Sequence, residues 1–222
     1  VSGGTKEVRY YGSLGYDKDN GVINRSYSDR YSMRMNFDGN ITTKLKMNLR
    51  LNGNVQKRNN HMRDINPIDY AYNTTRALPA YQQDGSYYYY SRSPISISRT
   101  HDRFDYNILN ELDNSSDMYN GAGVNANLDL KYTFSPQLDL SVGGTYTRNS
   151  TSQEQWWGEQ TNYIAGLRNA EYGVQPPKGE IGMSELPYGG SIQNTQTVGD
   201  NFGLRIQGDY RKSFGADLQH LI

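Results

Sequence analysis

The sequence predicts an all-β protein, and more specifically a segment of an antiparallel transmembrane β-barrel. Six segments alternate apolar and polar residues over about a dozen positions, with their charges on the polar side. The connections alternate between tight turns and long irregular stretches. Aromatic residues of the apolar side gather near the segment ends. Long strands, unequal loops and aromatic girdles are together typical of outer-membrane barrels.

The clearest alternation runs from Leu45 to Val55. Successive side chains of a strand point to opposite faces, so this segment has one apolar face and one charged, polar face. The segment before it, at about residues 28–41, alternates in the same way. Only Thr42-Thr43-Lys44 separates the two, and so short a turn predicts an antiparallel hairpin.

The whole chain, residues 1–222, is interpreted as part of one barrel domain without a plug. Strands are expected at about residues 5–17, 28–41, 45–58, 120–134, 138–152, 199–211 and 217–222. The last strand has no clear phase. The long loops are expected at 59–119 and 153–198, with short helices starting at Asn66-Pro67, ending before Pro79, and at Tyr106 to Leu112.

The composition excludes several classes of protein. The 222 residues carry 23 basic and 23 acidic side chains, so no basic excess points to nucleic acid. Cysteine is absent, and no run approaches the 18 apolar residues of a membrane helix. The low mean hydropathy of −0.87 still allows a barrel, because only half of each strand faces lipid. The first residues lack the features of a signal peptide, so an exported protein would be a mature chain or an internal piece.

A soluble β-sandwich acting as a surface-exposed binding or adhesin module is the main alternative, because its inner faces would also lack charge. Strand length, loop asymmetry and the aromatic ends favour the barrel. Seven strands leave two unpaired edges, which lipid does not tolerate. We therefore expect a piece of a larger barrel.

Two groups of residues are candidates for function. The first is expected to line the lumen. Its members could be ordinary hydrated wall with cross-strand pairing, or they could line a polar path or hold the plug: Arg34, Lys46, Arg50, Lys131 and Arg205. The second lies in the long loops and could contact substrate or a partner, or could serve packing and interfacial anchoring: Tyr87, Tyr88, Tyr89, Tyr90, Trp156 and Trp157. No catalytic constellation, cofactor motif or metal-ligand spacing is present, so an enzyme is not expected.

Several stretches resemble the SusC/RagA family of TonB-linked outer-membrane proteins. They are Ser2 to Thr5, Val8 to Tyr16, Arg30 to Asn36, Ala77 to Tyr81, Asp84 to Tyr87 and Asn107 to Leu112. The likeness covers essentially the whole chain at the level of strand order and loop texture. No single motif carries it; the set, in this order, does.

The resemblance implies a barrel of 22 strands in the bacterial outer membrane of Bacteroidota, with an N-terminal plug inside. It also implies import of glycans or peptides, a SusD-like surface lipoprotein as a lid, and energy from TonB-ExbB-ExbD through an N-terminal part missing from this sequence. The surrounding partner would be outer-membrane lipid. The sequence itself does not identify the substrate.

Overall fold

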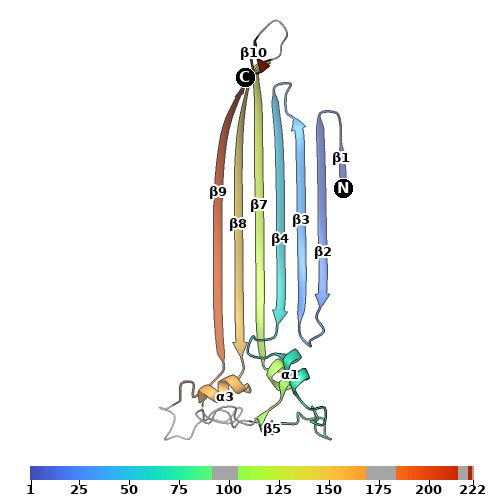
Figure 1. Cartoon of the computed structure of the whole chain (residues 1–222), viewed down its shortest axis with the longest axis vertical. Coiled ribbons are helices and arrows are strands. Elements are labelled where there is room, and N and C mark those ends of the chain that lie inside the picture. Colours follow the sequence, from blue (N-terminus) through green and yellow to red (C-terminus); the bar gives the residue numbers. More distant parts are fainter. Residues whose placement is uncertain (92–104, 169–183, 215–219, 222) are drawn as a thin grey trace.

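One antiparallel sheet of seven strands dominates the computed structural model, which describes residues 1–91, 105–168, 184–214 and 220–221 (Figure 1). The strand order is β1-β2-β3-β4-β7-β8-β9. Its strands are β1 (Ser2–Gly4), β2 (Val8–Asn20), β3 (Tyr27–Asn40), β4 (Leu45–Asn60), β7 (Ser115–Ser135), β8 (Leu138–Trp157) and β9 (Ser191–Tyr210). Two short ladders pair β5 (Tyr90–Ser91) with β6 (Asp105–Tyr106), and β10 (Ser213–Phe214) with β11 (His220–Leu221).

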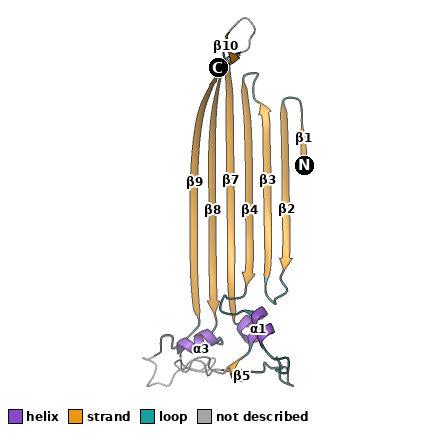
Figure 2. Cartoon of the chain, in the orientation of Figure 1, coloured by secondary structure: helices purple, strands orange, loops and turns teal. Residues whose placement is uncertain are grey.

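The two ends of the sheet differ. Three short helices, α1 (Pro67–Asn73), α2 (Ile108–Asp113) and α3 (Asn162–Arg168), gather at one end, which we call the loop end (Figure 2). Tight connections lie at the other, the turn end. No helix in the described part of the chain has the length and apolar character needed to cross a membrane. The loop asymmetry expected from the sequence is therefore present.

The two faces of the sheet are chemically opposite. On the apolar face, Leu14 is 84% exposed, Phe202 is 80% exposed and Leu204 is 75% exposed. The described residues contain no second large sheet that could cover these side chains. The soluble β-sandwich alternative is therefore wrong, because its apolar faces would be buried against each other. An open sheet with this face uncovered is a partial barrel wall.

The apolar residues form a band that crosses the sheet obliquely. On β2 the band runs from Val8 to Tyr16, and on β8 it runs from Leu138 to Tyr146, about nine residues each, a length that suits a tilted membrane strand. The ladder through β3, β4 and β7, however, places Tyr16 of β2 in register with Ser150 of β8, which is four residues beyond Tyr146. The band is thus displaced by about four residues, or about 13 Å, over four strand spacings of about 4.8 Å each. This corresponds to a strand tilt of about 35°, within the range for membrane barrels.

Tyrosines mark the loop-end edge of this band. Tyr16 stacks on Tyr31 at 4.8 Å between ring centroids, and its hydroxyl donates a hydrogen bond of 3.1 Å to Asp29. Tyr146 packs against Phe202 at 4.9 Å and donates a hydrogen bond of 3.0 Å to Asp200. In both cases the ring lies on the apolar band and the hydroxyl reaches a charged residue beyond it. This is the geometry expected at a membrane–water interface.

Three strands extend at least five residues beyond their predicted ends. β7 begins at Ser115 rather than near 120, β8 continues to Trp157 rather than 152, and β9 begins at Ser191 rather than 199. The ladder stays paired there, for example Ser116 with Trp156 and Gln155 with Gln193. Past the apolar band most residues on both faces are polar, so backbone pairing continues where the alternation that reveals a strand has stopped. The long loops are accordingly shorter than predicted.

The predicted first and last strands also need correction. The first begins at Val8, because the Thr5 hydroxyl accepts hydrogen bonds from the backbone N–H groups of Glu7 and Val8 and turns the chain, while Ser2–Gly4 pairs back as β1. Of the predicted strand at 217–222, only residues 220–221 are described, as β11, and they pair with β10 rather than with the main sheet. The seventh strand of the sheet is β1. Helix α1 starts as predicted but ends at Asn73, well before Pro79.

The hydrophobic core is small and lies at the loop end. Met62, Ile65 and Leu112 are buried there and pack with partly buried side chains that include Ile23 and Trp157. These residues come from the β2–β3 connection, from the segment after β4, from α2 and from the end of β8. The core therefore holds the loops on the sheet. The strands themselves are stabilised by their ladder hydrogen bonds and by their surroundings.

Candidate functional site

The five predicted lumen residues all lie on the polar face of the sheet. Arg34 lies opposite Asn52 in the ladder, and Asn52 points to the same face of β4 as Lys46 and Arg50. Lys131 lies directly opposite Lys46. Arg205 joins the same face through Gly143 and Asp129. The structure thus brings these side chains onto one surface, as the alternation predicts. That this surface lines a lumen stays a prediction.

Two of the five cations are held by carboxylates. The Lys131 ammonium lies 2.8 Å from Asp139 Oδ2, and Arg211 Nη2 donates to the same oxygen at 2.8 Å. Arg205 Nη2 donates to Asp129 Oδ1 at 3.1 Å. These pairs cross strands β7, β8 and β9, so they join neighbouring strands as well as neutralising charge.

Gly143 makes room for the Asp129–Arg205 pair. It lies between the two residues in the ladder, and a Cβ at this position would approach Asp129 Oδ1 to 2.6 Å. The lack of a side chain lets the carboxylate lie over the strand toward Arg205. The pair borders a polar-face hollow of about 310 Å³ that is also lined by Asn127 and Thr145.

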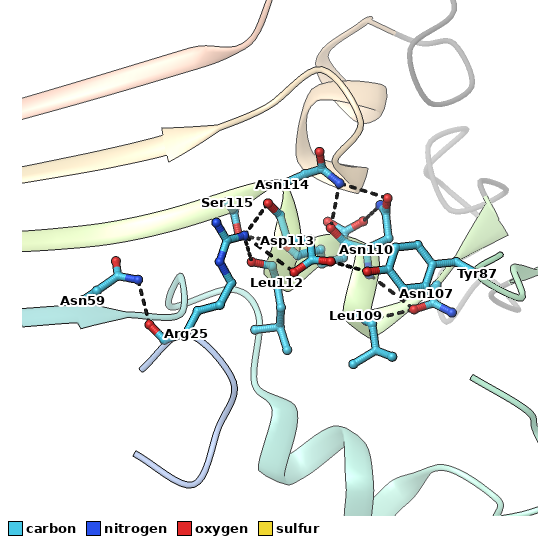
Figure 3. Close-up of polar contacts among 11 residues, drawn as sticks. Arg25, Asn59, Tyr87, Asn107, Leu109, Asn110, Leu112, Asp113, Asn114 and Ser115 are labelled. Carbon is cyan, nitrogen blue, oxygen red and sulfur yellow. Dashed lines mark hydrogen bonds and ion pairs between the residues drawn. The ribbon is translucent and has the colours of Figure 1, made fainter. Parts of the chain in front are cut away.

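At the loop end, the side chain of Asn107 joins the chain at Ala80 and at Tyr88 to helix α2. Figure 3 shows its contact with α2. Its Nδ2 donates to the backbone oxygens of Ala80 at 2.9 Å and Tyr88 at 2.8 Å. Its Oδ1 accepts from the N–H groups of Leu109 at 2.8 Å and Asn110 at 3.3 Å, which caps α2. The residue is only 3% exposed, so these bonds form away from water.

Arg25 holds the other end of α2. It is the one non-glycine residue with positive φ (68°) in the described chain, and Asn59 Nδ2 donates to its backbone oxygen at 2.8 Å. Its guanidinium donates to the backbone oxygens of Leu112 and Asp113, the last residues of the helix (Figure 3). A cation at a helix C-terminus also compensates the unpaired carbonyl groups there. The β2–β3 connection is thereby fastened to α2.

A second buried group organises α3. Both carboxylate oxygens of Glu111 accept from the backbone N–H of Asn162, at 3.1 and 3.0 Å, where α3 begins. At the end of α3, the buried Arg168 donates to Glu159 at 2.9 Å and to the backbone oxygen of Gly189 at 2.8 Å. Glu159 also accepts from Gly189 N at 2.8 Å. The end of β8, α3 and the start of β9 are thus joined by charge-assisted hydrogen bonds.

The tyrosines at 87–90 lie together but in different surroundings. The Tyr87 hydroxyl donates to Asp113, which raises its pKa to about 12, and the ring stacks on Tyr81. Tyr89 donates to Asn110 at 3.1 Å, and Tyr90 packs edge-on against Tyr106. Tyr88 leaves 37% of its surface exposed. Three of the four therefore have contacts that hold the loops, and Tyr88 offers surface for contact with another molecule.

The two tryptophans are separated by the strand they share. Trp157 packs into the core with Met62 and Ile65, and it stacks on Tyr163 at 4.9 Å. Trp156 points to the opposite face and pairs with Ile192, in the alternation that carries Tyr146. Trp157 is thus a packing residue, whereas Trp156 lies on the apolar side near the loop end.

The Glu159 contacts predict a pH-dependent loop. Hydrogen bonds from Gly189 N and then Arg168 lower the Glu159 pKa below its ordinary value of 4.5. A lowered pKa in the folded state means that the stabilisation is present above pH 4.5 and is lost as pH falls through the folded-state pKa. We expect the hydrogen-exchange protection of Gly189 N to fall over this acidic range. Glu159→Gln should remove the pH dependence, and an unchanged profile in that variant would contradict this assignment.

Sequence reasoning missed the residues that build the loop end. Asn107 carried a partial signal, since Asn often caps a helix. Arg25, Glu111 and Arg168 gave none, because their partners are up to 88 residues away in the chain and include backbone oxygens. In the described part of the chain, no three His, Cys, Asp or Glu side chains form a group that could hold a metal.

Fold and faces together define a class: part of a membrane β-barrel with one lipid-type face, one polar face and a built-up loop end. Comparison with known proteins adds a more particular likeness. No family model matches the chain. The chain is 26% identical over 173 residues to TonB-dependent receptor P26 of Formosa agariphila. The aligned region covers 73% of this chain and 16% of that protein.

Three solved structures share the fold. The RagAB peptide transporter matches with a TM-score of 0.61 at 17% identity, over 97% of this chain and 22% of that one. The RagAB peptide importer matches in its closed-closed state with a TM-score of 0.65, 16% identity and coverage of 96% and 22%. In its open-open state it matches with a TM-score of 0.64, 17% identity and coverage of 97% and 21%.

These comparisons confirm the resemblance to TonB-linked proteins of the SusC/RagA type expected from the sequence. The chain resembles a barrel segment of the SusC/RagA type, and it spans about a fifth of the length of the proteins it matches. The similar proteins are a receptor and transporters, which agrees with the expectation that this chain is not an enzyme.

Proposed function

We propose that this chain forms part of the wall and of the extracellular loops of a TonB-dependent importer in a bacterial outer membrane. The observation that carries the proposal is the oblique apolar band, whose width suits a membrane crossing by tilted strands. The likeness to TonB-dependent receptor P26 and to the RagAB peptide transporter supports the same conclusion. Peptides, or glycans of similar size, are the proposed cargo.

The polar face would line the path of the cargo, with Arg34, Lys46, Arg50, Lys131 and Arg205 as hydrated wall. The loop end would face the outside, where a SusD-like surface lipoprotein would contact it. Energy would come from TonB-ExbB-ExbD through a plug outside this chain. In this mechanism the segment does no chemistry; its task is to hold a water-filled passage open within lipid.

Uptake by the full-length protein tests this function. The protein carrying this segment is produced in a host that lacks related importers, and uptake of labelled short peptides and oligosaccharides is measured. We expect uptake to depend on TonB and on the presence of the protein in the outer-membrane fraction. TonB-independent uptake, or a protein recovered from the aqueous fraction, would contradict the proposal.

Aromatic contacts at the loop end give a narrower test. Tyr88→Ala removes the more exposed ring, while Trp156→Ala removes a ring on the apolar face as the matched control. We expect Tyr88→Ala to weaken cargo or lipoprotein association by about fivefold or more, as loss of an interfacial aromatic side chain commonly does, and Trp156→Ala to leave it unchanged. Equal association in both variants would show that Tyr88 serves packing alone. Trp157→Ala is unsuitable, because Trp157 belongs to the core.

A further inference from the structure

At the level of the apolar band and toward the turn end, the cations on the polar face of the strands fall into two groups. Arg9, Lys131, Arg205 and Arg211 each have a carboxylate oxygen within 3.9 Å. Arg34, Lys46 and Arg50 have no such partner among the described residues, and all three are exposed. The Arg34 guanidinium meets only a neutral group in its ladder, donating to Asn52 Oδ1 at 3.2 Å.

The ladder explains why these three charges stay uncompensated. Arg50 lies opposite Asn36 and Asn127, and Arg34 lies opposite Ser13 and Asn52, so their direct neighbours are neutral. Lys46 lies opposite Asn40 and another cation, Lys131. The carboxylates diagonal to them, Asp38 and Asp129, already face Arg9 and Arg205. Like charges directly opposite each other, such as Lys46 and Lys131, destabilise a sheet.

The position of Arg34, Lys46 and Arg50 behind the apolar band strengthens their electrostatic potential. All three residues lie within the stretch of β3 and β4 whose other face carries the apolar band, from Leu45 to Val55 on β4. A passage lined by one sign of charge, with low-dielectric walls behind it, concentrates its potential and attracts counter-ions. The same charges at the loop end would be screened by water and salt.

We propose that this cationic stripe, Arg34, Lys46 and Arg50, binds the carboxylates of an acidic peptide lying extended along β4. Arg34 is level with Asn52, so the cations lie at positions 52, 50 and 46 of the strand. An extended peptide has the same rise per residue as the strand, about 3.3 Å. Carboxylates at its positions i, i+2 and i+6 would therefore meet the three cations, and the two arginines offer paired donors to a carboxylate.

This inference rests on the proposed import function and narrows the cargo to acidic peptides. The test uses the full-length transporter and heptapeptides with Glu at positions 1, 3 and 7. Two comparison peptides have the same composition with Glu at 1, 2 and 5, or Gln in place of Glu. The variant combines Arg34→Gln, Lys46→Gln and Arg50→Gln. The control variant is Arg211→Gln, which removes a polar-face cation whose carboxylate, Asp139, keeps Lys131 as a partner.

We expect the triple variant to bind the 1,3,7 peptide about tenfold to a hundredfold more weakly, at about two- to fivefold per exposed ion pair. The loss should shrink as salt rises, and Arg211→Gln should cause little change. If the triple variant bound the acidic peptide as well as the unmodified protein and still took up the Gln peptide, the proposed role of the stripe would be overturned. The proposed import function would stand. Loss of uptake of all peptides would mean that the stripe holds the protein's own acidic segment instead, which would also overturn the proposal.

Discussion

Replacing Ile206 by arginine is expected to destabilise the assembled barrel by about 2–4 kcal/mol, the cost of a cation near the bilayer midplane. Ile206 lies in the middle of the β9 part of the apolar band and is 66% exposed. In water, so exposed a side chain could become arginine with little change, because surface substitutions are usually within about 0.5 kcal/mol. The size of the effect therefore reports what surrounds this face.

The neighbouring residue supplies the control. Gln207 lies on the polar face, where its amide nitrogen Nε2 donates to Asp209 Oδ1 at 2.9 Å. Gln207→Arg therefore places a cation beside a carboxylate. We expect Gln207→Arg to leave stability nearly unchanged. Denaturant unfolding of the full-length protein in lipid vesicles, together with its level in the outer membrane, measures the difference. Equal stability of the two variants would contradict a lipid environment for the apolar face.

The second large effect is expected from Asn107→Asp, which changes almost no volume. The carboxylate keeps the acceptor for Leu109 N and Asn110 N, but it loses both N–H donors to Ala80 and Tyr88. Two backbone oxygens would then face a buried negative charge. Leaving buried polar groups unpaired costs about 1–3 kcal/mol, and more for a charged group. The segment from Ala80 to Tyr88 should therefore open locally while α2 keeps its cap.

Asn66→Asp is the matched control for this loop. Asn66 also caps a helix, α1, but it is exposed, and its Oδ1 accepts a hydrogen bond from Asp69 N at 3.1 Å. Aspartate accepts that bond equally well, so stability should hardly change. Hydrogen exchange of the segment from Ala80 to Tyr88 in the full-length protein distinguishes the variants. Full protection in Asn107→Asp would show that these two donor bonds do not hold the loop.

Much of the sheet was predictable because the membrane-type band leaves a strong pattern. Leu45 to Val55 and the hairpin through Thr42 are placed as the alternation indicates. The loop-end parts of β8 and β9 were not predictable, because polar residues there occupy most positions on both faces and leave no regular period. Helix α3 was missed for a related reason: its seven residues are too few to show a helical period.

The candidate site was also predictable only in part. Period two alone assigns Arg34, Lys46 and Arg50 to one face, but pairing across strands decides which cations find a carboxylate. Asp129 reaches Arg205, 76 residues away, over Gly143. Likewise, Trp156 and Trp157 look equivalent in the sequence, and only packing separates a core residue from one on the apolar side.

The sequence by itself determined the alternating strands, their two faces and the inequality of the two ends, because each depends on near neighbours along the chain. The tertiary structure alone decided the tilt of the apolar band, the uncompensated stripe on β3 and β4, and the hydrogen-bonded loop end. Those features depend on strand register and on contacts between segments far apart in the chain. A register shift of one residue would leave the composition unchanged and exchange the two faces of a strand.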